Sequence, residues 1–172
     1  MLYFYRAHRK WRYEQHNRHY TKALINGTEL IDIYHECGKT DSEGNLTVTL
    51  AIICEQQYEY VEARKLYEKA TEIMQEKGDR ENEAHTNEKS GIMSYFLSDY
   101  DRAREYFKEG LSIRIDYGDK AREANCCGNL GTVFQCIGEY DNAKEYLQKA
   151  LAIRIQIGDK DGKAAEDRKS VV

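Results

Sequence analysis

The sequence predicts an all-α solenoid built from antiparallel helix pairs. The main evidence is a 40-residue period in which four positions are identical in every copy. A fixed period of this length is typical of repeat arrays, in which each unit buries its apolar face only against its neighbours. The 172 residues include no proline, which permits long uninterrupted helices. The identical positions are Tyr20, Tyr60, Tyr100 and Tyr140; Ala23, Ala63, Ala103 and Ala143; Ile33, Ile73, Ile113 and Ile153; and Gly38, Gly78, Gly118 and Gly158.

The first unit, residues 1–38, departs from the others. Its first helix is expected over residues 1–18, but Trp11 falls at a position where the later units have a small residue (Ala51, Gly91, Gly131). An indole does not fit where two helices must approach closely. Either the register of this helix shifts or the unit is a degenerate cap.

The next three units, residues 39–78, 79–118 and 119–158, are each expected to form a helix, a short turn and a second helix. In the last unit, apolar or small residues recur every three or four positions, as on one face of an α-helix. These residues are Ala124, Cys127, Leu130, Gly131, Phe134 and Ile137 on the first helix, and Ala143, Tyr146, Leu147, Ala150, Leu151, Ile153 and Ile157 on the second.

Each unit ends at a glycine, the residue that closes a helix in the left-handed conformation without steric cost. The aspartate that follows, Asp79 or Asp119, is expected to cap the next helix through its carboxylate. After the first unit the glycine is followed by Lys39, so Asp41 or Ser42 is expected to act as the cap.

Residues 159–172 begin a fifth unit and then stop. Ala164 matches Ala124 of the preceding unit, but Ser170-Val171 replaces Leu130-Gly131. We expect a partial first helix here, at the end of a fragment or at a diverged terminus. An unfinished last unit also predicts self-association, because its apolar face has no following helix to cover it.

The fourth unit resembles the tetratricopeptide repeat (TPR), on the strength of Cys127, Leu130-Gly131, Phe134, Ala143, Leu147 and Ala150. The 40-residue period is longer than the usual TPR unit of about 34 residues. In this it is similar to the long-helix repeats of the Pins/LGN G-protein-signalling modulators and of related animal scaffold arrays. The resemblance implies a right-handed superhelix. It also implies a non-catalytic scaffold or adaptor that binds a peptide or helical segment in its concave groove.

In TPR proteins the first helix of each unit lines the concave side, so polar positions opposite its packed face are the expected partner-binding residues. Amides, a cation and an aromatic ring at such positions suit an extended or helical peptide, acidic peptides included. The predicted partner-binding residues are Asn45, Thr49, Glu55, His85, Lys89, Tyr95, Asn125, Asn129 and Gln135, with Ile92 and Phe96 on the same face.

The net charge of −4 conceals an asymmetry along the chain. Residues 1–22 carry six basic side chains and one acid, or +5, which leaves −9 for residues 23–172. One alternative function is therefore an RNA-binding TPR module that uses the basic N-terminal segment. The acidic body argues against nucleic acid, because phosphate contacts dominate such affinity. A second alternative is a purely architectural segment of a longer TPR array.

No catalytic, cofactor-binding or metal-binding residue is predicted. The sequence has no glycine-rich phosphate loop, His-Glu-x-x-His or Cys-x-x-Cys motif. Its many acidic residues are expected at solvent positions of amphipathic helices. Five cysteines without framework spacing are expected to be reduced thiols, mostly small apolar fillers, in a cytosolic compartment. No run of about 18 apolar residues occurs, so no membrane span is expected.

Overall fold

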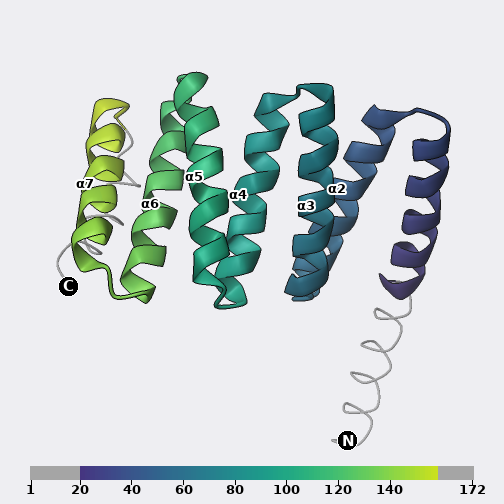
Figure 1. Ribbon diagram of the computed structural model, residues 1–172, viewed down its shortest axis with the longest axis horizontal. Helices are drawn as coiled ribbons and strands as arrows, with labels where there is room; N and C mark the ends of the chain where they lie inside the picture. The colour runs from purple at the N-terminus through teal and green to yellow at the C-terminus, as the bar shows by residue number, and fades with distance from the viewer. Residues whose placement is uncertain (1–19, 159–172) are drawn as a thin grey trace, which may run out of the picture.

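The structure, a computed structural model, describes residues 20–158, which form seven helices and no strand. A helix over residues 20–36 comes first, and six more follow it along the chain (Figure 1). They are α2 (Thr40–Gln56), α3 (Tyr60–Lys77), α4 (Arg80–Phe96), α5 (Tyr100–Asp116), α6 (Lys120–Cys136) and α7 (Tyr140–Gln156). The predicted all-α solenoid is confirmed. The expectations for the degenerate helix around Trp11 and for a partial helix after residue 158 lie outside the described residues.

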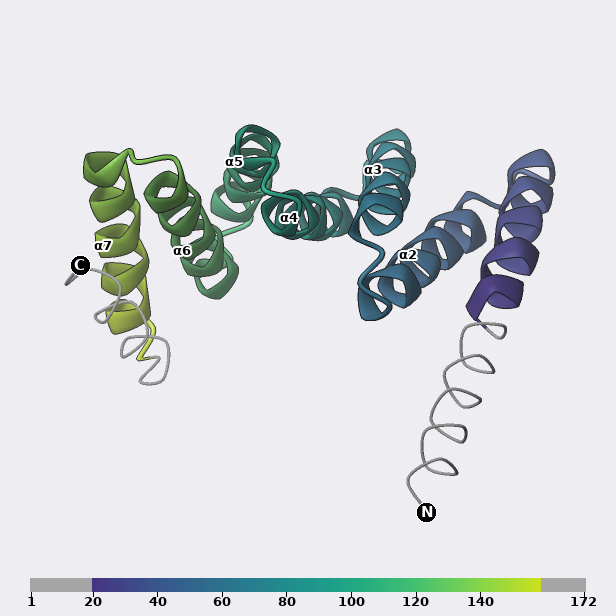
Figure 2. The same cartoon turned by 90° about the horizontal axis from the view of Figure 1, so that it is seen from below.

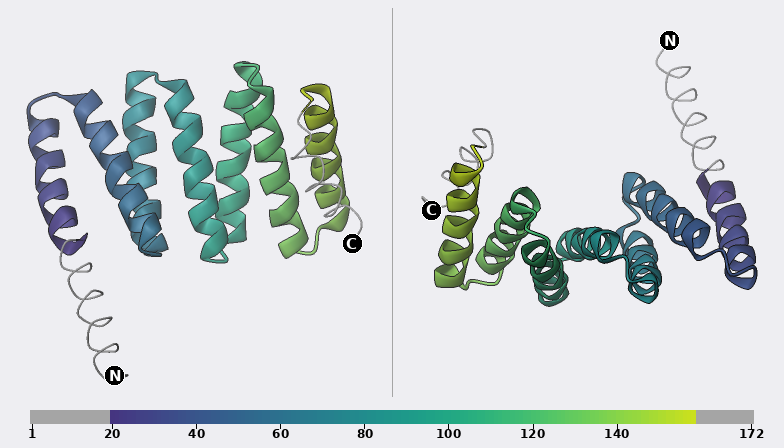
Figure 3. Two further views of the ribbon diagram at one scale, coloured as in Figure 1. Left: turned by 180° about the vertical axis from the view of Figure 1, so that it is seen from behind. Right: turned by 90° about the horizontal axis from the view of Figure 1, so that it is seen from above.

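The helices form an arch with two layers (Figure 2). The inner side is lined by α2, α4 and α6, and the outer side by the helix over residues 20–36 with α3, α5 and α7. Views from behind and from above show the same alternation (Figure 3). From α2 to α7, each helix packs mainly on the helices that precede and follow it in the chain. Over residues 20–158, no helix is both long and apolar enough to cross a membrane.

The helix ends follow the predicted turn chemistry, with one exception. Gly78 and Gly118 have φ angles of +70° in the left-handed region, where a side chain would be strained. Asp79 and Asp119 cap α4 and α6, and each carboxylate accepts a bond from a backbone N–H three residues later at 3.2 and 3.1 Å. The cap predicted for α2 was wrong. The helix begins after Lys39 with no side-chain cap, so Asp41 and Ser42 lie in its first turn.

Small residues lie where the two helices of a unit approach most closely. A methyl group added at Gly131 would lie 2.6 Å from Cγ of Leu147, and one at Gly91 would lie 2.8 Å from Cε1 of Phe107. Real side chains do not approach this closely. Only glycine therefore allows α6 to lie against α7, and α4 against α5, at their observed separation.

The expectation that acidic residues fall at solvent positions was wrong for one position of the repeat. Glu43, Glu83 and Glu123, spaced by 40 residues, are each only 4% exposed. Two of them pair with a basic residue three positions earlier: Lys120 Nζ lies 2.7 Å from Glu123, and Arg80 lies 2.8 Å from Glu83. A carboxylate in the first turn also interacts favourably with the helix dipole. The two effects together offset the cost of burying the charge.

Candidate functional site

Two adjoining cavities open between the inner helices and share Phe96 as a common wall. The larger, of about 560 Å³, lies between α2 and α4, and the smaller, of about 340 Å³, lies between α4 and α6. We call them together the Phe96 groove. The larger is lined by Ile52, Glu55, Gln56, Tyr58, Tyr60, Lys89 and Phe96, and the smaller by Ile92, Tyr95, Phe96, Phe107, Asn129 and Thr132.

One wall of the larger cavity carries an ion pair that joins two inner helices. Lys89 Nζ on α4 lies 3.1 Å from both carboxylate oxygens of Glu55 on α2. The hydroxyl of Tyr67, which rises from the core on α3, donates to Glu55 at 2.7 Å. Burial is the main cause that raises the pKa of Tyr67, and the hydrogen bond to Glu55 raises it further. This phenol therefore keeps the proton that it donates. The positive charge expected of Lys89 is therefore neutralised within the groove.

Four aromatic rings, of which Tyr58 and Phe96 are exposed and Tyr60 and Tyr95 are partly buried, form a continuous contact series along the groove. The ring of Tyr60, at the start of α3, stacks on Phe96 of α4 with centroids 4.8 Å apart. Tyr58 lies edge-on to Tyr60 at 6.2 Å, and Tyr95 contacts Phe96 at 5.9 Å. Phe96 keeps 53% of its surface exposed although it contacts other rings. An exposed apolar surface of this kind is typical of interaction sites.

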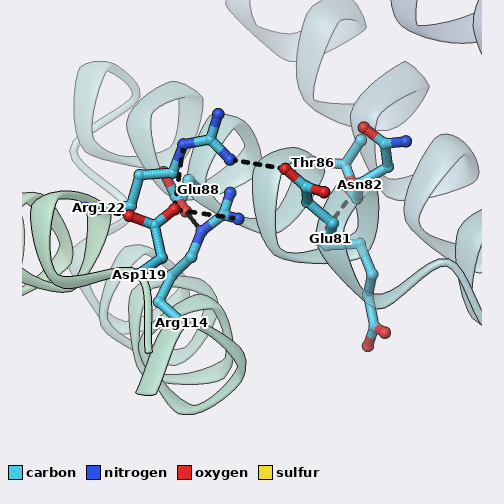
Figure 4. A network of polar contacts seen from close by, with 8 residues as sticks. Glu81, Asn82, Thr86, Glu88, Arg114, Asp119 and Arg122 are labelled. Atoms are coloured by element: carbon cyan, nitrogen blue, oxygen red, sulfur yellow. Dashed lines mark hydrogen bonds and ion pairs between the residues drawn. The ribbon is translucent and has the colours of Figure 1, made fainter. Parts of the chain in front are cut away.

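A buried arginine contacts two of the inner helices (Figure 4). Arg114 of α5 is only 2% exposed, and its Nε donates to Glu88 of α4 at 2.7 Å. Its Nη1 lies 4.0 Å from Asp119 at the start of α6. Asp119 also pairs with Arg122 at 3.6 Å, and Arg122 reaches Glu81 of α4 at 3.4 Å. These charge-assisted contacts join α4 to α6, both directly and through α5.

The structure brings four of the nine predicted partner-binding residues into the Phe96 groove: Glu55, Lys89, Tyr95 and Asn129. The other five line neither cavity. Thr49 donates to the carbonyl of Asn45 in its own helix at 2.8 Å, and Asn125 accepts a bond from Arg154 at 2.7 Å. His85 is half-buried on α4, and Gln135 is half-buried on α6.

The electrostatics of His85 differ from those of a free surface histidine. Burial is the main cause that lowers the pKa of His85. The negative charge of Glu88 acts in the opposite direction, and the positive charges of Lys89 and Arg122 lower the pKa further. Its ring is therefore neutral at pH 7 and can offer one donor and one acceptor.

The sequence reasoning missed Tyr58 and Tyr60 as groove residues and Arg114 as a buried link. For Tyr58 a signal was present: the equivalent position 80 residues later is Gly138, so a bulky residue stands in a turn slot that suits glycine. For Arg114 the signal was Met74, which lies 40 residues earlier at the same position of the repeat. An apolar residue at that position indicates that the position is buried.

Among residues 20–158, no group of three or more histidine, cysteine or acidic side chains could hold a metal ion. All five cysteines are free thiols. Cys54, Cys126 and Cys127 are buried, as the filler interpretation expects, whereas Cys37 and Cys136 are exposed.

The family model described as tetratricopeptide repeat matches residues 42–116 and 82–156 of this chain. None of the curated proteins that were compared matches it. Among solved structures, the chain is similar to BtubC (BKLC) from P. vanneervenii, with 25% identity and a TM-score of 0.69 over 77% of this chain. The matched part spans 56% of BtubC.

Two further structures share the fold at lower identity. The N-terminal domain of stress-induced protein-1 (STI-1) from C. elegans is 13% identical, with a TM-score of 0.61 over 75% of this chain and 94% of that domain. The putative kinesin light chain TPR-like repeats of Podosopora anserina are 15% identical, with a TM-score of 0.61 over 86% of this chain and 83% of theirs. The predicted TPR resemblance is confirmed by these matches, which do not extend to the Pins/LGN modulators in particular.

Proposed function

This chain belongs to the tetratricopeptide repeat family, and from that premise we propose that it is a non-catalytic scaffold or adaptor that binds a peptide or helical segment of a partner protein in the Phe96 groove. TPR domains are in general protein-interaction modules. The observation that carries the groove proposal is the pair of open cavities on the inner helices, with the half-exposed Phe96 between them. Polar groups at their edges, Asn129 and the Lys89–Glu55 pair, can orient a bound backbone.

The charge of the groove favours a partner other than the acidic peptide that the sequence also allowed. Lys89 is the one basic residue lining either cavity, and Glu55 already neutralises it. Residues 20–158 carry 17 basic and 25 acidic side chains, or −8. An acidic ligand would therefore approach against the long-range field and find no unpaired cation in the groove.

The alternative RNA-binding function used the basic N-terminal segment, most of which lies outside the described residues. The acidic balance of residues 20–158 gives it no support. The architectural alternative, with self-association through the last unit, likewise concerns residues beyond 158. Both remain outcomes that the experiment below distinguishes. Cytoplasmic location is proposed from the free state of the five cysteines.

The test is affinity capture of partners by the wild type and by the double variant Phe96→Ala/Asn129→Ala. Both substitutions remove groove-lining side chains, one from α4 and one from α6. The matched control is Tyr117→Ala/Asn142→Ala, which makes the same kinds of change at exposed positions that line neither cavity of the Phe96 groove. A partner that is retained by the control and lost by the groove variant, with unchanged thermal melting, supports the proposal.

Two results would contradict it. Equal capture by the groove variant and the control would move binding away from the Phe96 groove and favour the architectural function. Capture that disappears after nuclease treatment would favour RNA.

A further inference from the structure

Tyr58 has a backbone conformation that a bulky residue rarely adopts. Its φ angle is +63°, and within residues 20–158 only Ser98 shares a positive φ without being glycine. The two occupy the same slot of the repeat as Gly138, whose φ is +80°. The left-handed conformation is unfavourable for a residue with a side chain. Glycine would meet the demands of this turn without that cost.

Burial in the core does not explain why tyrosine occupies this position. The residue is 77% exposed, the highest exposure among the large hydrophobic residues of the described chain. Its ring instead forms one side of the larger cavity of the Phe96 groove, edge-on to Tyr60, which stacks in turn on Phe96. Strain at an exposed residue that lines a cavity points to ligand binding rather than to folding.

The same cavity offers a carboxylate next to the aromatic rings. Glu55 accepts bonds from Lys89 and from the Tyr67 hydroxyl, and its side chain keeps 26% of its surface exposed. A carboxylate has about four acceptor positions, so it can take a further donor. The aromatic faces attract a cation, and the carboxylate, whose charge Lys89 balances, adds acceptor positions for the donors of that cation.

Among cationic side chains, arginine matches both features. Its guanidinium is planar, stacks on aromatic rings and donates in a fork that fits a carboxylate, whereas the lysine ammonium is a strongly hydrated point charge. The net −8 of residues 20–158 draws a basic partner toward the protein as a whole.

We propose that the larger cavity of the Phe96 groove binds an arginine side chain of the partner protein. The guanidinium lies against the rings of Tyr58 and Phe96 and donates to Glu55, which it shares with Lys89. This proposal rests on the proposed function, because it names the chemistry of the segment that the groove takes.

The experiment uses fluorescent peptide pools that are randomised except for one central residue: arginine, citrulline, leucine or glutamate. Citrulline keeps the planar shape of arginine without its charge. For the wild type, measured by fluorescence anisotropy, we expect the arginine pool to bind about tenfold more tightly than the citrulline pool. We expect Tyr58→Gly to abolish that preference while its melting temperature stays equal or rises, because the variant takes the residue found at Gly138.

The matched control is Ser98→Gly, which relieves the same backbone conformation in the next unit without removing an aromatic ring. It should keep the arginine preference. Equal affinity for the arginine and citrulline pools, or a Tyr58→Gly variant that keeps the preference, would overturn the arginine proposal and leave the groove function standing. If the wild type bound none of the pools and the Phe96→Ala/Asn129→Ala variant captured every partner, both proposals would fall.

Discussion

Lys89 on α4 and Glu55 on α2 form an ion pair across the groove, with both N–O distances at 3.1 Å. Both side chains are 26% exposed, so the pair is neither a solvated surface contact nor a fully buried one. Among residues 20–158 it is one of few polar contacts between two inner helices, and its two residues lie 34 positions apart in the sequence. It therefore stabilises the spacing between α2 and α4 as well as neutralising the groove.

The coupling between Lys89 and Glu55 can be measured by a double-mutant cycle with Lys89→Met and Glu55→Gln. We expect a coupling free energy of about 0.5–1 kcal/mol, because partial exposure screens the pair. Urea unfolding of the four proteins gives the value. Additive effects of the two substitutions would show that the pair contributes nothing to the arch.

Arg114→Met should destabilise the protein by about 3 kcal/mol, because it leaves Glu88, which is mostly buried, without its cation. The preceding unit has an apolar pair at the equivalent positions, with Met74 in place of Arg114 and Val48 in place of Glu88. The double variant Arg114→Met/Glu88→Val should therefore recover most of the lost stability in chemical denaturation. A single variant as stable as the wild type would show that the buried network of Figure 4 is dispensable.

Gly131→Ala should lower stability by about 1–3 kcal/mol, although alanine is the better helix former by about 1 kcal/mol. The new methyl group would lie 2.6 Å from Cγ of Leu147, a side chain that is only 2% exposed. The control is the same substitution in a Leu147→Ala background, where the methyl group fills vacated space. There it should be neutral or stabilising, and equal destabilisation in both backgrounds would refute the packing explanation.

Thiol labelling should separate the cysteines by burial. In the native protein at pH 8, a thiol reagent should modify Cys37 and Cys136, which are exposed. The three buried thiols should react only after denaturation, because burial raises the pKa of each and excludes the reagent. Mass spectrometry before and after denaturant gives the count of adducts. Rapid native labelling of Cys127 would contradict its position in the core.

Stability should also fall at alkaline pH because of these thiols. Burial raises the pKa of Cys127 from 9.0 to about 11. Between these values the unfolded chain has lost the proton while the folded chain retains it, so unfolding becomes more favourable as pH rises. The contribution is fully present below pH 9 and is lost as pH passes 11. A Cys127→Ala variant should show a shallower decline in urea unfolding over this range, and an identical slope would exclude Cys127 as a cause.

Several features of the groove could be predicted from sequence, and others could not. The spacing placed Glu55, Lys89, Tyr95 and Asn129 on one face, and the structure finds all four at the cavities. It could not show that Lys89 and Glu55 pair with each other. That contact joins separate units, and its distance depends on how far α4 is rotated and shifted against α2.

The buried charged residues also could not be predicted from the sequence. Within a single helix, the charge of Glu43, Glu83 and Glu123 predicts that these side chains face solvent. In the structure each of them is buried. Burial at these positions comes from the neighbouring outer helix and from a nearby basic residue. Arg114 is covered only once α6 packs against α5.

By itself, the sequence determined the all-α repeat architecture, the helix pairs and the glycine-closed helix ends, because these depend on periodicity and on backbone conformations that are set within a few residues. Only the tertiary structure decided which groove residues remain available to a partner. It neutralised Lys89 and buried Arg114. It also brought Tyr58, whose backbone is strained, into the same cavity as Phe96, a residue 38 positions away. The physical reason is that the backbone hydrogen bonds of a helix form within that helix, whereas the contacts of its surface side chains are made with helices of neighbouring units.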